Sequence, residues 1–488
     1  MNVFDFIFES TGDLGKNVVL GPRRQISYKD LFFKSSRLAR IIKSEVGENK
    51  PILILSENSI FFITSYLAIL KSGNVCVPLN PNIEKTNLES IIKRTDIKQA
   101  FISDKYQEMF KDYKMQIFGE DYPGNLREEI TSDNSRQKYD FDSARLAEII
   151  FTSGSTGEQK GVLITHKNKI ANTSSIIEYL HLTQSDTIEV VLPFYYCYGL
   201  SLLLTHLRVG GSLVLNNNFM FIGSVLNDIN KYKVTGFAGV PSHFQILLRK
   251  TRDFKTTLFP SLRYVTQAGG KLHEIFINEF VEIFPKIMFY VMYGQTEATA
   301  RLSYLPPEVL SQKPGSIGRG IPGVMLKVVD ENGESVKPNE TGEIIANGDN
   351  IMVGYLDDPD ATSKALQDGW LHTGDLATVD ADGYIYIQSR KKEIIKVGGI
   401  RISPKEIEEV IVSYPGIVDC TIESINDEFL GEAMKATIFI NEADRHLFSE
   451  KLIKSHCADH LASHKIPQII LFDTKLPFNA AGKKVNKF

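Results

Sequence analysis

Small hydroxyl residues, glycines and one lysine gather between two short apolar runs, residues 149–151 and 162–164. These residues are Thr152, Ser153, Gly154, Ser155, Thr156, Gly157 and Lys160. Glycine lets backbone N–H groups converge on an anion, the hydroxyls donate further hydrogen bonds, and the lysine supplies a positive charge. The stretch therefore predicts a phosphate-binding loop, and a flexible Ser/Gly linker is the alternative. It is not a Walker loop, because the G-x-x-x-x-G-K-[ST] spacing is absent.

Two further groups of polar residues follow predicted strands. In the stretch 292–297, Thr296 could donate a hydrogen bond to a phosphate and Glu297 offers the hard oxygen ligand that Mg²⁺ prefers. Ligands of α/β proteins bind at the carboxyl ends of parallel strands, although a solvated turn or helix cap is the commoner role of such a pair. Gly269 and its neighbours also follow a strand, and small residues there permit close backbone approach.

Asp375 stands directly after a glycine in the stretch 370–375. A carboxylate in that position is suited to accept hydrogen bonds from two neighbouring hydroxyl groups, such as those of a ribose.

A competing metal site is suggested by the spacing of His456, Cys457, His460 and His464. Three histidines at these positions share one face of a helix and resemble part of a zinc cluster. Since no second group of ligands lies nearby in the sequence, an ordinary helix is favoured.

From residue 51 onward, short apolar segments alternate with longer segments of helical character. Such alternation predicts α/β units on a largely parallel sheet, with one set before the phosphate loop and a second set after it. The expected strands are 52–55, 75–77, 100–102, 189–192, 212–215, 236–238, 264–266 and 287–290, and the expected helices include 167–179, 200–207, 222–232 and 272–284. Residues 106–143 are charged and weakly patterned, so we expect a surface excursion there.

From about residue 315 the pattern changes to short strands with turn residues, including the hairpin pair Asp382-Gly383. The basic run 390–392 separates this β-rich part from a final mixed segment, so we expect domains at 1–391 and 392–488. The expected fold is α/β, with a large N-terminal domain of two α/β subdomains and a small β-rich subdomain. A small α+β C-terminal domain follows.

Composition excludes several classes of protein. A chain of 488 residues is too long for one hydrophobic core, and its net charge of −4 gives no electrostatic case for a nucleic acid partner. Four cysteines without a C-x-x-C pair indicate free thiols in a reducing compartment. The longest apolar run, about residues 60–70, is too short to span a bilayer. We therefore expect no integral membrane segment and a cytoplasmic location.

The order and spacing of these motifs resemble the adenylate-forming superfamily of acyl-CoA synthetases, peptide-synthetase adenylation domains and luciferases. The match is nearest in style to stand-alone acyl- or aryl-acid ligases. The resemblance implies that ATP and Mg²⁺ activate a small carboxylic acid to an acyl-adenylate with release of pyrophosphate. It further implies transfer of the acyl group to CoA, or to the phosphopantetheine of a separate carrier protein, after the mobile C-terminal domain turns.

The resemblance also implies roles for individual residues. It implies catalytic roles for Lys483, Thr296 and Glu297, with Glu297 as the magnesium ligand. ATP binding falls to Thr152, Ser153, Gly154, Ser155, Thr156, Gly157, Lys160, Gly269, Tyr293, Asp375 and Arg390, with Tyr293 on adenine and the last two on ribose. The acyl pocket is placed at Tyr196, Gly199, Ala268, Gly270 and Gln295, the hinge at Lys392, and the pantetheine tunnel at Gly398 and Gly399.

The chain departs from the family pattern at three places. Ser389 replaces the usual glycine before Arg390, Phe478-Asn479 replaces Lys-Thr before Lys483, and Tyr196 stands where relatives often have histidine.

The acid itself is constrained by the segment 192–200, which contains no aspartate or glutamate. An α-ammonium group buried there would be unpaired, so a fatty, aryl or other non-amino acid is favoured over an amino acid. An amino-acid adenylation enzyme, a luciferase-like oxidative enzyme and a non-catalytic nucleotide-binding protein remain the alternatives.

Overall fold

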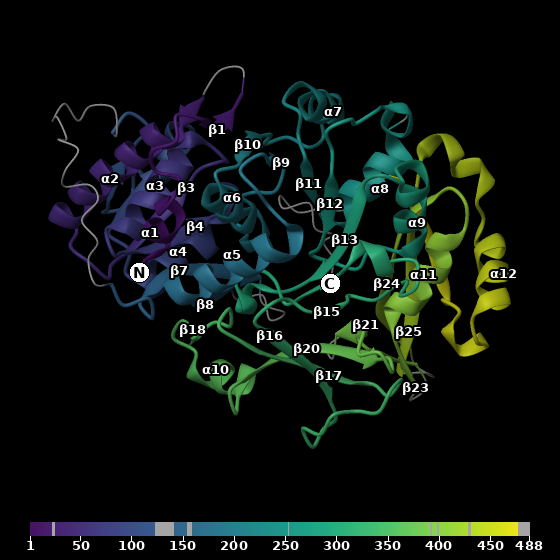
Figure 1. Cartoon of the computed structure of the whole chain (residues 1–488). Helices are drawn as coiled ribbons and strands as arrows, with labels where there is room; N and C mark the ends of the chain where they lie inside the picture. The colour runs from purple at the N-terminus through teal and green to yellow at the C-terminus, as the bar shows by residue number, and fades with distance from the viewer. Residues whose placement is uncertain are drawn as a thin grey trace.

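The computed structural model describes residues 1–21, 25–122, 141–153, 159–251, 253–390, 393–397, 400–427 and 431–476. Two mainly parallel sheets with their helices form the larger part, and two smaller sheets lie beside them (Figure 1). Within these ranges, no helix combines the length and apolar character needed to cross a membrane.

The N-terminal sheet has the strand order β18-β8-β7-β4-β3-β5-β6. Its strands are β3 (Pro51–Leu55), β4 (Val75–Leu79), β5 (Gln99–Ile102), β6 (Gln116–Phe118), β7 (Leu146–Ser153), β8 (Gln159–Thr165) and β18 (Gly354–Tyr355). Strands β3 to β7 pair in parallel, whereas β8 returns antiparallel to β7 and β18 pairs antiparallel to β8. The predicted phosphate loop therefore connects two paired strands.

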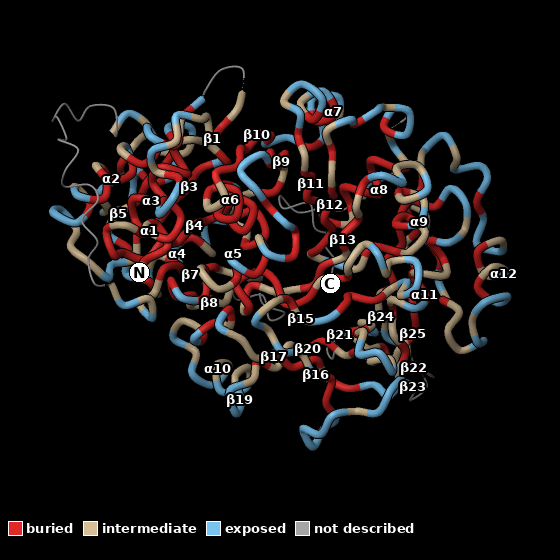
Figure 2. The backbone as a smooth tube through the Cα atoms, viewed as in Figure 1, coloured by how far each residue is buried: buried red, intermediate tan, exposed pale blue. Residues whose placement is uncertain are grey.

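The central sheet has the order β15-β14-β13-β12-β11-β9-β10-β1-β2. Its strands are β1 (Asn17–Leu20), β2 (Ile26–Ser27), β9 (Thr187–Val190), β10 (Ser212–Leu215), β11 (Gly236–Gly239), β12 (Tyr264–Gln267), β13 (Met288–Tyr293), β14 (Ser303–Leu305) and β15 (Arg319–Gly320). The inner strands pair in parallel, so β12 and β13 end at the same edge of the sheet. Figure 2 shows β11, β12 and β13 as mainly buried.

Helices cover both sheets, and some of them begin at a side-chain cap. They are α1 (Val3–Phe8), α2 (Tyr28–Glu45), α3 (Ile60–Lys71), α4 (Lys85–Thr95), α5 (His166–Leu180), α6 (Cys197–Val209), α7 (Ile222–Lys231), α8 (Pro241–Lys250) and α9 (Glu274–Ile283). The helix α5 begins with a capping box, in which Thr165 and Asn168 satisfy each other's backbone N–H groups. Its start directly after β8 ties the helix to the phosphate loop.

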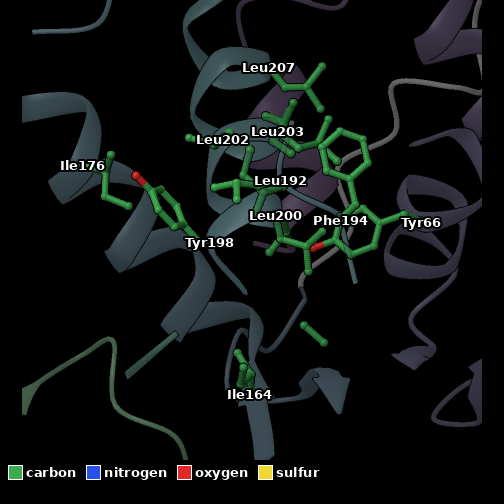
Figure 3. Close-up of a cluster of buried hydrophobic side chains, with 14 of the residues drawn as sticks. Tyr66, Ile164, Ile176, Leu192, Phe194, Tyr198, Leu200, Leu202, Leu203 and Leu207 are labelled. Carbon is green, nitrogen blue, oxygen red and sulfur yellow. The ribbon is translucent and has the colours of Figure 1, made fainter. Parts of the chain in front are cut away.

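The core between the two large sheets is apolar and aromatic. Tyr66 of α3, Ile176 of α5 and a row of α6 residues belong to one buried cluster, part of which Figure 3 shows. The same cluster contains β-strand residues of both sheets. Since α6 is buried on nearly every side, its first turn is held rigidly where the acyl pocket is predicted.

Two antiparallel sheets complete the fold. The β-rich sheet contains β16 (Val324–Val329), β17 (Gly342–Gly348), β19 (Leu366–Gln367), β20 (Trp370–Val379) and β21 (Ile385–Arg390), and α10 (Pro359–Ala365) lies between its strands in the chain. The C-terminal sheet contains β22 (Ile395–Val397), β23 (Ile400–Ile402), β24 (Ile417–Asp427), β25 (Gly431–Ile440) and β26 (Ile469–Asp473), with α11 (Pro404–Ser413) and α12 (Glu450–His460).

The C-terminal sheet and its helices pack against the side of the central sheet that carries α9 (Figure 1). Buried residues of α9 and α11, including Phe276 and Ile407, belong to one cluster. Polar contacts cross the same boundary, because Glu409 pairs with Lys271 at 2.5 Å and accepts a hydrogen bond from the Glu274 backbone. The boundary predicted between residues 391 and 392 falls outside the described ranges and stays a prediction.

The expected α/β fold with its small C-terminal α+β domain is confirmed, and so are the predicted parallel strands. Two expectations about elements need correction. Strand β13 continues to Tyr293, so this tyrosine belongs to the strand rather than to the loop after it. Within the predicted surface excursion, β6 adds to the edge of the N-terminal sheet by pairing with β5.

Candidate active site

The flanks of the predicted phosphate loop are the paired ends of β7 and β8. Thr152 lies opposite Lys160, and Ser153 opposite Gln159. Gly154, Ser155, Thr156 and Gly157 lie outside the described residues. The Lys160 ammonium lies 3.7 Å from the Asp358 carboxylate and 4.8 Å from the centre of the Tyr355 ring. Its side chain is about one-third exposed, so an anionic ligand could still reach it.

Two predicted ATP-binding residues, Tyr293 and Arg390, donate hydrogen bonds to the carboxylate of a third, Asp375. The three residues come from two different sheets. The Tyr293 hydroxyl donates to Asp375 Oδ2 at 2.6 Å, and Arg390 Nε donates to Oδ1 at 3.2 Å. Asp375 and Arg390 are register partners on β20 and β21, while Tyr293 ends β13 of the central sheet. Burial and the Asp375 charge raise the pKa of Tyr293 well above its usual range, so the phenol stays a donor.

This arrangement holds Asp375 without using up its acceptor capacity. A carboxylate has about four lone-pair positions, of which Tyr293 and Arg390 take one each. The Asp375 backbone N–H also bonds the Thr373 hydroxyl, at 3.2 Å. Asp375 is therefore oriented, charged and still able to accept hydrogen bonds from a diol.

Glu297 lies in a short 3₁₀ turn, Thr296–Ala298, directly after β13. Tyr355 of β18 donates its hydroxyl to Glu297 Oε1 at 2.8 Å, and the Met352 N–H bonds the Glu297 carbonyl at 2.8 Å. Burial and the Glu297 charge raise the pKa of Tyr355, which keeps it protonated as a donor. The Thr296 hydroxyl lies 3.6 Å from the sulfur of Cys197, the first residue of α6.

Glu297 is a single carboxylate, which suits Mg²⁺ bound together with substrate phosphates better than a metal ion held by protein ligands alone. Among the described residues, no three His, Cys, Asp or Glu side chains form a metal cluster. Mg²⁺ usually keeps several waters and binds one or two carboxylates together with substrate phosphates. Glu297, oriented by Tyr355, matches that donor set.

The residues predicted for the acyl pocket lie on three neighbouring elements. Tyr196 precedes α6, Ala268 to Gly270 follow β12, and Gln295 follows β13. Ala268 is buried, and the backbone at Gly269 has φ 88°, which favours glycine. The Gln295 amide nitrogen is buried without a hydrogen-bond partner. An unsatisfied buried donor of this kind is expected where a ligand binds.

Gly199 has a packing reason of its own. A Cβ atom at this position would lie 2.1 Å from the Pro193 carbonyl oxygen, so only glycine fits where α6 crosses the preceding turn. Its place in α6 next to Tyr198 keeps it near the predicted pocket, but the close approach alone explains the residue.

Two of the proposed alternative metal ligands, His456 and His460, lie 4.5 Å apart between ring centres, but no group of three potential ligands forms among the described residues. Helix α12 ends at His460, so His464 does not share its face. His456 Nε2 donates to the Val410 carbonyl at 2.8 Å, and Cys457 is buried. Lys392, Gly398, Gly399 and Lys483 lie outside the described residues, so the hinge, the tunnel and the terminal lysine stay predictions.

Three residues at the site were missed by sequence reasoning. Tyr355 and Asp358 come from the β18–α10 region, some 200 positions beyond the loop they approach, and no local pattern marks them. Arg301 is buried four residues after Glu297. No pattern in the surrounding sequence, which mixes small, polar and apolar residues, indicates that burial.

Two family models match most of the chain, on either side of the segment 357–405 that carries Asp375 and Arg390. The pattern described as AMP-binding enzyme matches residues 10–356, and that of the AMP-binding enzyme C-terminal domain matches residues 406–483. The chain belongs to this family of AMP-binding enzymes. The family lies within the adenylate-forming superfamily, so the resemblance drawn from the motifs is confirmed.

Curated relatives of this AMP-binding enzyme match it along most of its length. The putative acyl-CoA synthetase YngI of Bacillus subtilis (strain 168) is 28% identical, covering 98% of this chain and 94% of the relative. The 4-coumarate–CoA ligase 3 of Arabidopsis thaliana is 30% identical, covering 92% and 82%. The oxalate–CoA ligase of Arabidopsis thaliana is 29% identical, covering 92% and 89%.

Solved structures share the fold of this AMP-binding enzyme. The anthranilate CoA ligase AuaEII with anthranoyl-AMP has a TM-score of 0.90 at 23% identity, covering 99% of this chain and 95% of the other. The o-succinylbenzoate CoA synthetase of Bacillus subtilis with its acyl-adenylate has a TM-score of 0.87 at 25% identity, covering 99% and 96%.

Proposed function

We propose that this AMP-binding enzyme activates a carboxylic acid with ATP, releases pyrophosphate, and transfers the acyl group from the acyl-adenylate to the thiol of CoA. The observation that carries the proposal is that Tyr293 and Arg390 both bond the Asp375 carboxylate, while Thr296 and Glu297 follow the strand that ends at Tyr293. Relatives named as CoA ligases favour CoA over a carrier-protein phosphopantetheine as the acceptor.

Each residue then has a defined task in the first half-reaction. Asp375 accepts hydrogen bonds from the ribose hydroxyls. Because Tyr293 of β13 holds Asp375, these bonds fix the nucleotide relative to β13. Thr296 donates to the α-phosphate, and Lys160 with the loop 152–157 neutralises the departing pyrophosphate. Mg²⁺, held by Glu297, would supply further positive charge on the phosphates. Catalysis consists chiefly of positioning and charge neutralisation.

Pyrophosphate exchange into ATP, measured across a panel of fatty, aryl, hydroxy, dicarboxylic and amino acids, tests the proposal. Asp375→Asn should lower kcat/KM for ATP by about 10- to 100-fold, because the amide replaces one acceptor oxygen of a charged hydrogen-bonded group. The matched control is Asp330→Asn, whose carboxylate accepts backbone hydrogen bonds in an exposed turn. Absence of exchange with every acid class, or oxygen uptake on adding ATP and acid, would contradict a CoA ligase.

A further inference from the structure

Arg301 is a buried cation without an acidic partner. Only 2% of the residue is exposed, yet its Nε has no hydrogen-bond partner, and Nη1 makes a long contact of 3.4 Å with the Ala300 carbonyl. Among the described residues it forms no ion pair with a carboxylate; Tyr179, which shares a hydrogen bond with it, Tyr198 and Cys197 are the groups that act on its charge. Guanidinium remains charged in proteins, so this site carries an uncompensated positive charge.

A second buried cation among the described residues is neutralised by a carboxylate. Lys169, also 2% exposed, lies 3.0 Å from the fully buried Glu148. A buried charge without a partner costs several kcal/mol. Among the described residues, Arg301 differs from Lys169 in having no carboxylate beside it, and an anionic ligand would supply the missing charge.

The backbone around Arg301 is built to aim this side chain inward. Thr299 and Ala300, just before it, have φ values of 60° and 129°, which non-glycine residues rarely adopt. The Arg301 carbonyl accepts hydrogen bonds from the side-chain amides of Asn350 at 2.8 Å and Asn172 at 3.2 Å. Strain of this kind persists only where the surroundings fix it, and it gathers at functional sites.

The Arg301 guanidinium lies beside the first turn of α6, where the acyl pocket is predicted. It stacks over the Tyr198 ring, 4.4 Å from its centre, and the Tyr198 hydroxyl bonds the Thr266 carbonyl at 3.1 Å, two residues before Ala268. Figure 3 shows Tyr198 on α6 at the border of the apolar cluster. Burial raises the pKa of Tyr196, and the positive charges of Arg301 and Arg390 oppose that shift. The charges of two arginines therefore act on Tyr196: Arg301, and Arg390 at the predicted ribose contact.

We propose that Arg301 is the specificity residue of this enzyme and binds a second carboxylate on the acid substrate, so that dicarboxylic acids are its substrate class. The inference rests on the proposed activation of an acid by ATP. One carboxylate of the substrate would lie toward Thr296 and the α-phosphate, while the other pairs with the guanidinium. A planar guanidinium suits a carboxylate because it can donate two parallel hydrogen bonds.

The same charge argues against two alternative substrate classes. An α-amino acid would bring an ammonium group toward a buried cation, and like charges in a low-dielectric site repel strongly. A simple fatty acid would leave the guanidinium unpaired in the complex, with its desolvation uncompensated.

The test compares straight-chain dicarboxylic acids with monocarboxylic acids of the same carbon number in pyrophosphate exchange. Wild-type enzyme should prefer the dicarboxylic member by about 10- to 100-fold in kcat/KM, the range of a charge-assisted hydrogen-bonded pair. Arg301→Met should remove that preference by lowering the rate with the dicarboxylic acid and keeping or raising the rate with the monocarboxylic acid. Arg301→Lys, which keeps the charge without the planar fork, should lie between the two.

Arg263→Met is the matched control. Arg263 also stacks on a tyrosine, with 4.6 Å to the Tyr264 ring centre, but it pairs with Asp186 at 3.0 Å. Its loss should lower stability without changing the preference between the two acid classes. If Arg301→Met and Arg263→Met both leave the preference unchanged, Arg301 is structural and the inference is wrong.

The outcomes separate this inference from the proposed function. Exchange with monocarboxylic acids at least as fast as with dicarboxylic acids in the wild type would overturn the inference and leave the proposed function standing. Exchange with no acid of either class would overturn the proposed function, and the inference with it.

Discussion

Glu297 shows how a catalytic role depends on a neighbour that is distant in sequence. Its carboxylate is oriented by the Tyr355 hydroxyl at 2.8 Å, from a strand on the other side of the site. The same tyrosine ring lies under the Lys160 ammonium. One aromatic residue therefore positions both the proposed metal ligand and the proposed pyrophosphate contact.

Tyr355→Phe tests that positioning role. Loss of the hydroxyl frees the Glu297 carboxylate to rotate but leaves the ring under Lys160, so the Mg²⁺ concentration for half-maximal exchange should rise by about 10-fold. The titration of exchange rate against Mg²⁺ measures it. Tyr386→Phe, which removes a 3.2 Å bond to Asp380 in a surface hairpin, is the control and should leave the titration unchanged. An equal shift in both variants would show that Tyr355 acts only through general stability.

At the scale of elements, the turn after β13 decides where Thr296, Glu297 and Arg301 lie. The chain reverses so tightly there that a Cβ atom on Gly294 would lie 2.0 Å from the Ala300 carbonyl oxygen. The Asn350 amide then closes the turn with bonds to the Ala298 and Arg301 carbonyls, at 3.2 and 2.8 Å. The site thus depends on one close backbone contact.

Gly294→Ala should therefore displace the turn. We expect a loss of at least about 2 kcal/mol in stability, since backbone on both sides of the clash must move, and exchange activity should fall with it. Gly223→Ala is the control, because nothing lies within 4 Å of a Cβ atom at that helical position and alanine favours a helix. Thermal unfolding and exchange assays of both variants give the comparison. Retained stability in Gly294→Ala would contradict the close contact.

Elements were largely predictable from the sequence, and their assembly was not. The alternation of apolar segments and helices gave the parallel strands, and Asp382-Gly383 gave the hairpin between β20 and β21. Nothing local indicates that β1 and β2 join the far edge of the central sheet, or that Tyr355 pairs beside β8. These pairings depend on burial summed over the whole chain. Likewise, Asp375 was recognisable from its motif, whereas the burial of Arg301 without a carboxylate partner among the described residues is a property of the folded molecule.

At the scale of the whole molecule, buried histidines make stability depend on pH. Burial lowers the pKa of His166 and of His243 to about 3 each, and that of His206 to about 4. These histidines are neutral in the folded protein but bind protons near pH 6.5 when the chain is unfolded. The stability that they contribute is therefore present above that pH and is lost as the pH falls below it. Burial raises the pKa of Glu189, which works in the opposite direction.

His243→Leu isolates one of these contributions. Between pH 7.5 and pH 5.5 each buried histidine should cost about 1.4 kcal/mol of stability, because the unfolded chain binds a proton that the folded chain does not. The His243 ring lies 4.1 Å from that of Phe219 in an apolar setting, so leucine should be tolerated. Urea midpoints at the two pH values should therefore differ less in the variant than in the wild type. The same difference in both would show that the pKa of His243 is not lowered in the folded state.

The arrangement of domains leads to the last prediction. The C-terminal sheet lies against α9 through Glu409 and the shared apolar cluster, while Lys483 follows some ten residues after β26. If Lys483 assists only adenylation, Lys483→Ala should abolish pyrophosphate exchange and leave transfer from a supplied acyl-adenylate to CoA intact. Lys475→Ala, on the same terminal segment but outside the motif, should affect neither half-reaction. Loss of both half-reactions in Lys483→Ala would contradict the prediction that Lys483 serves adenylation but not transfer to CoA. Undiminished exchange would show that Lys483 is not a catalytic residue.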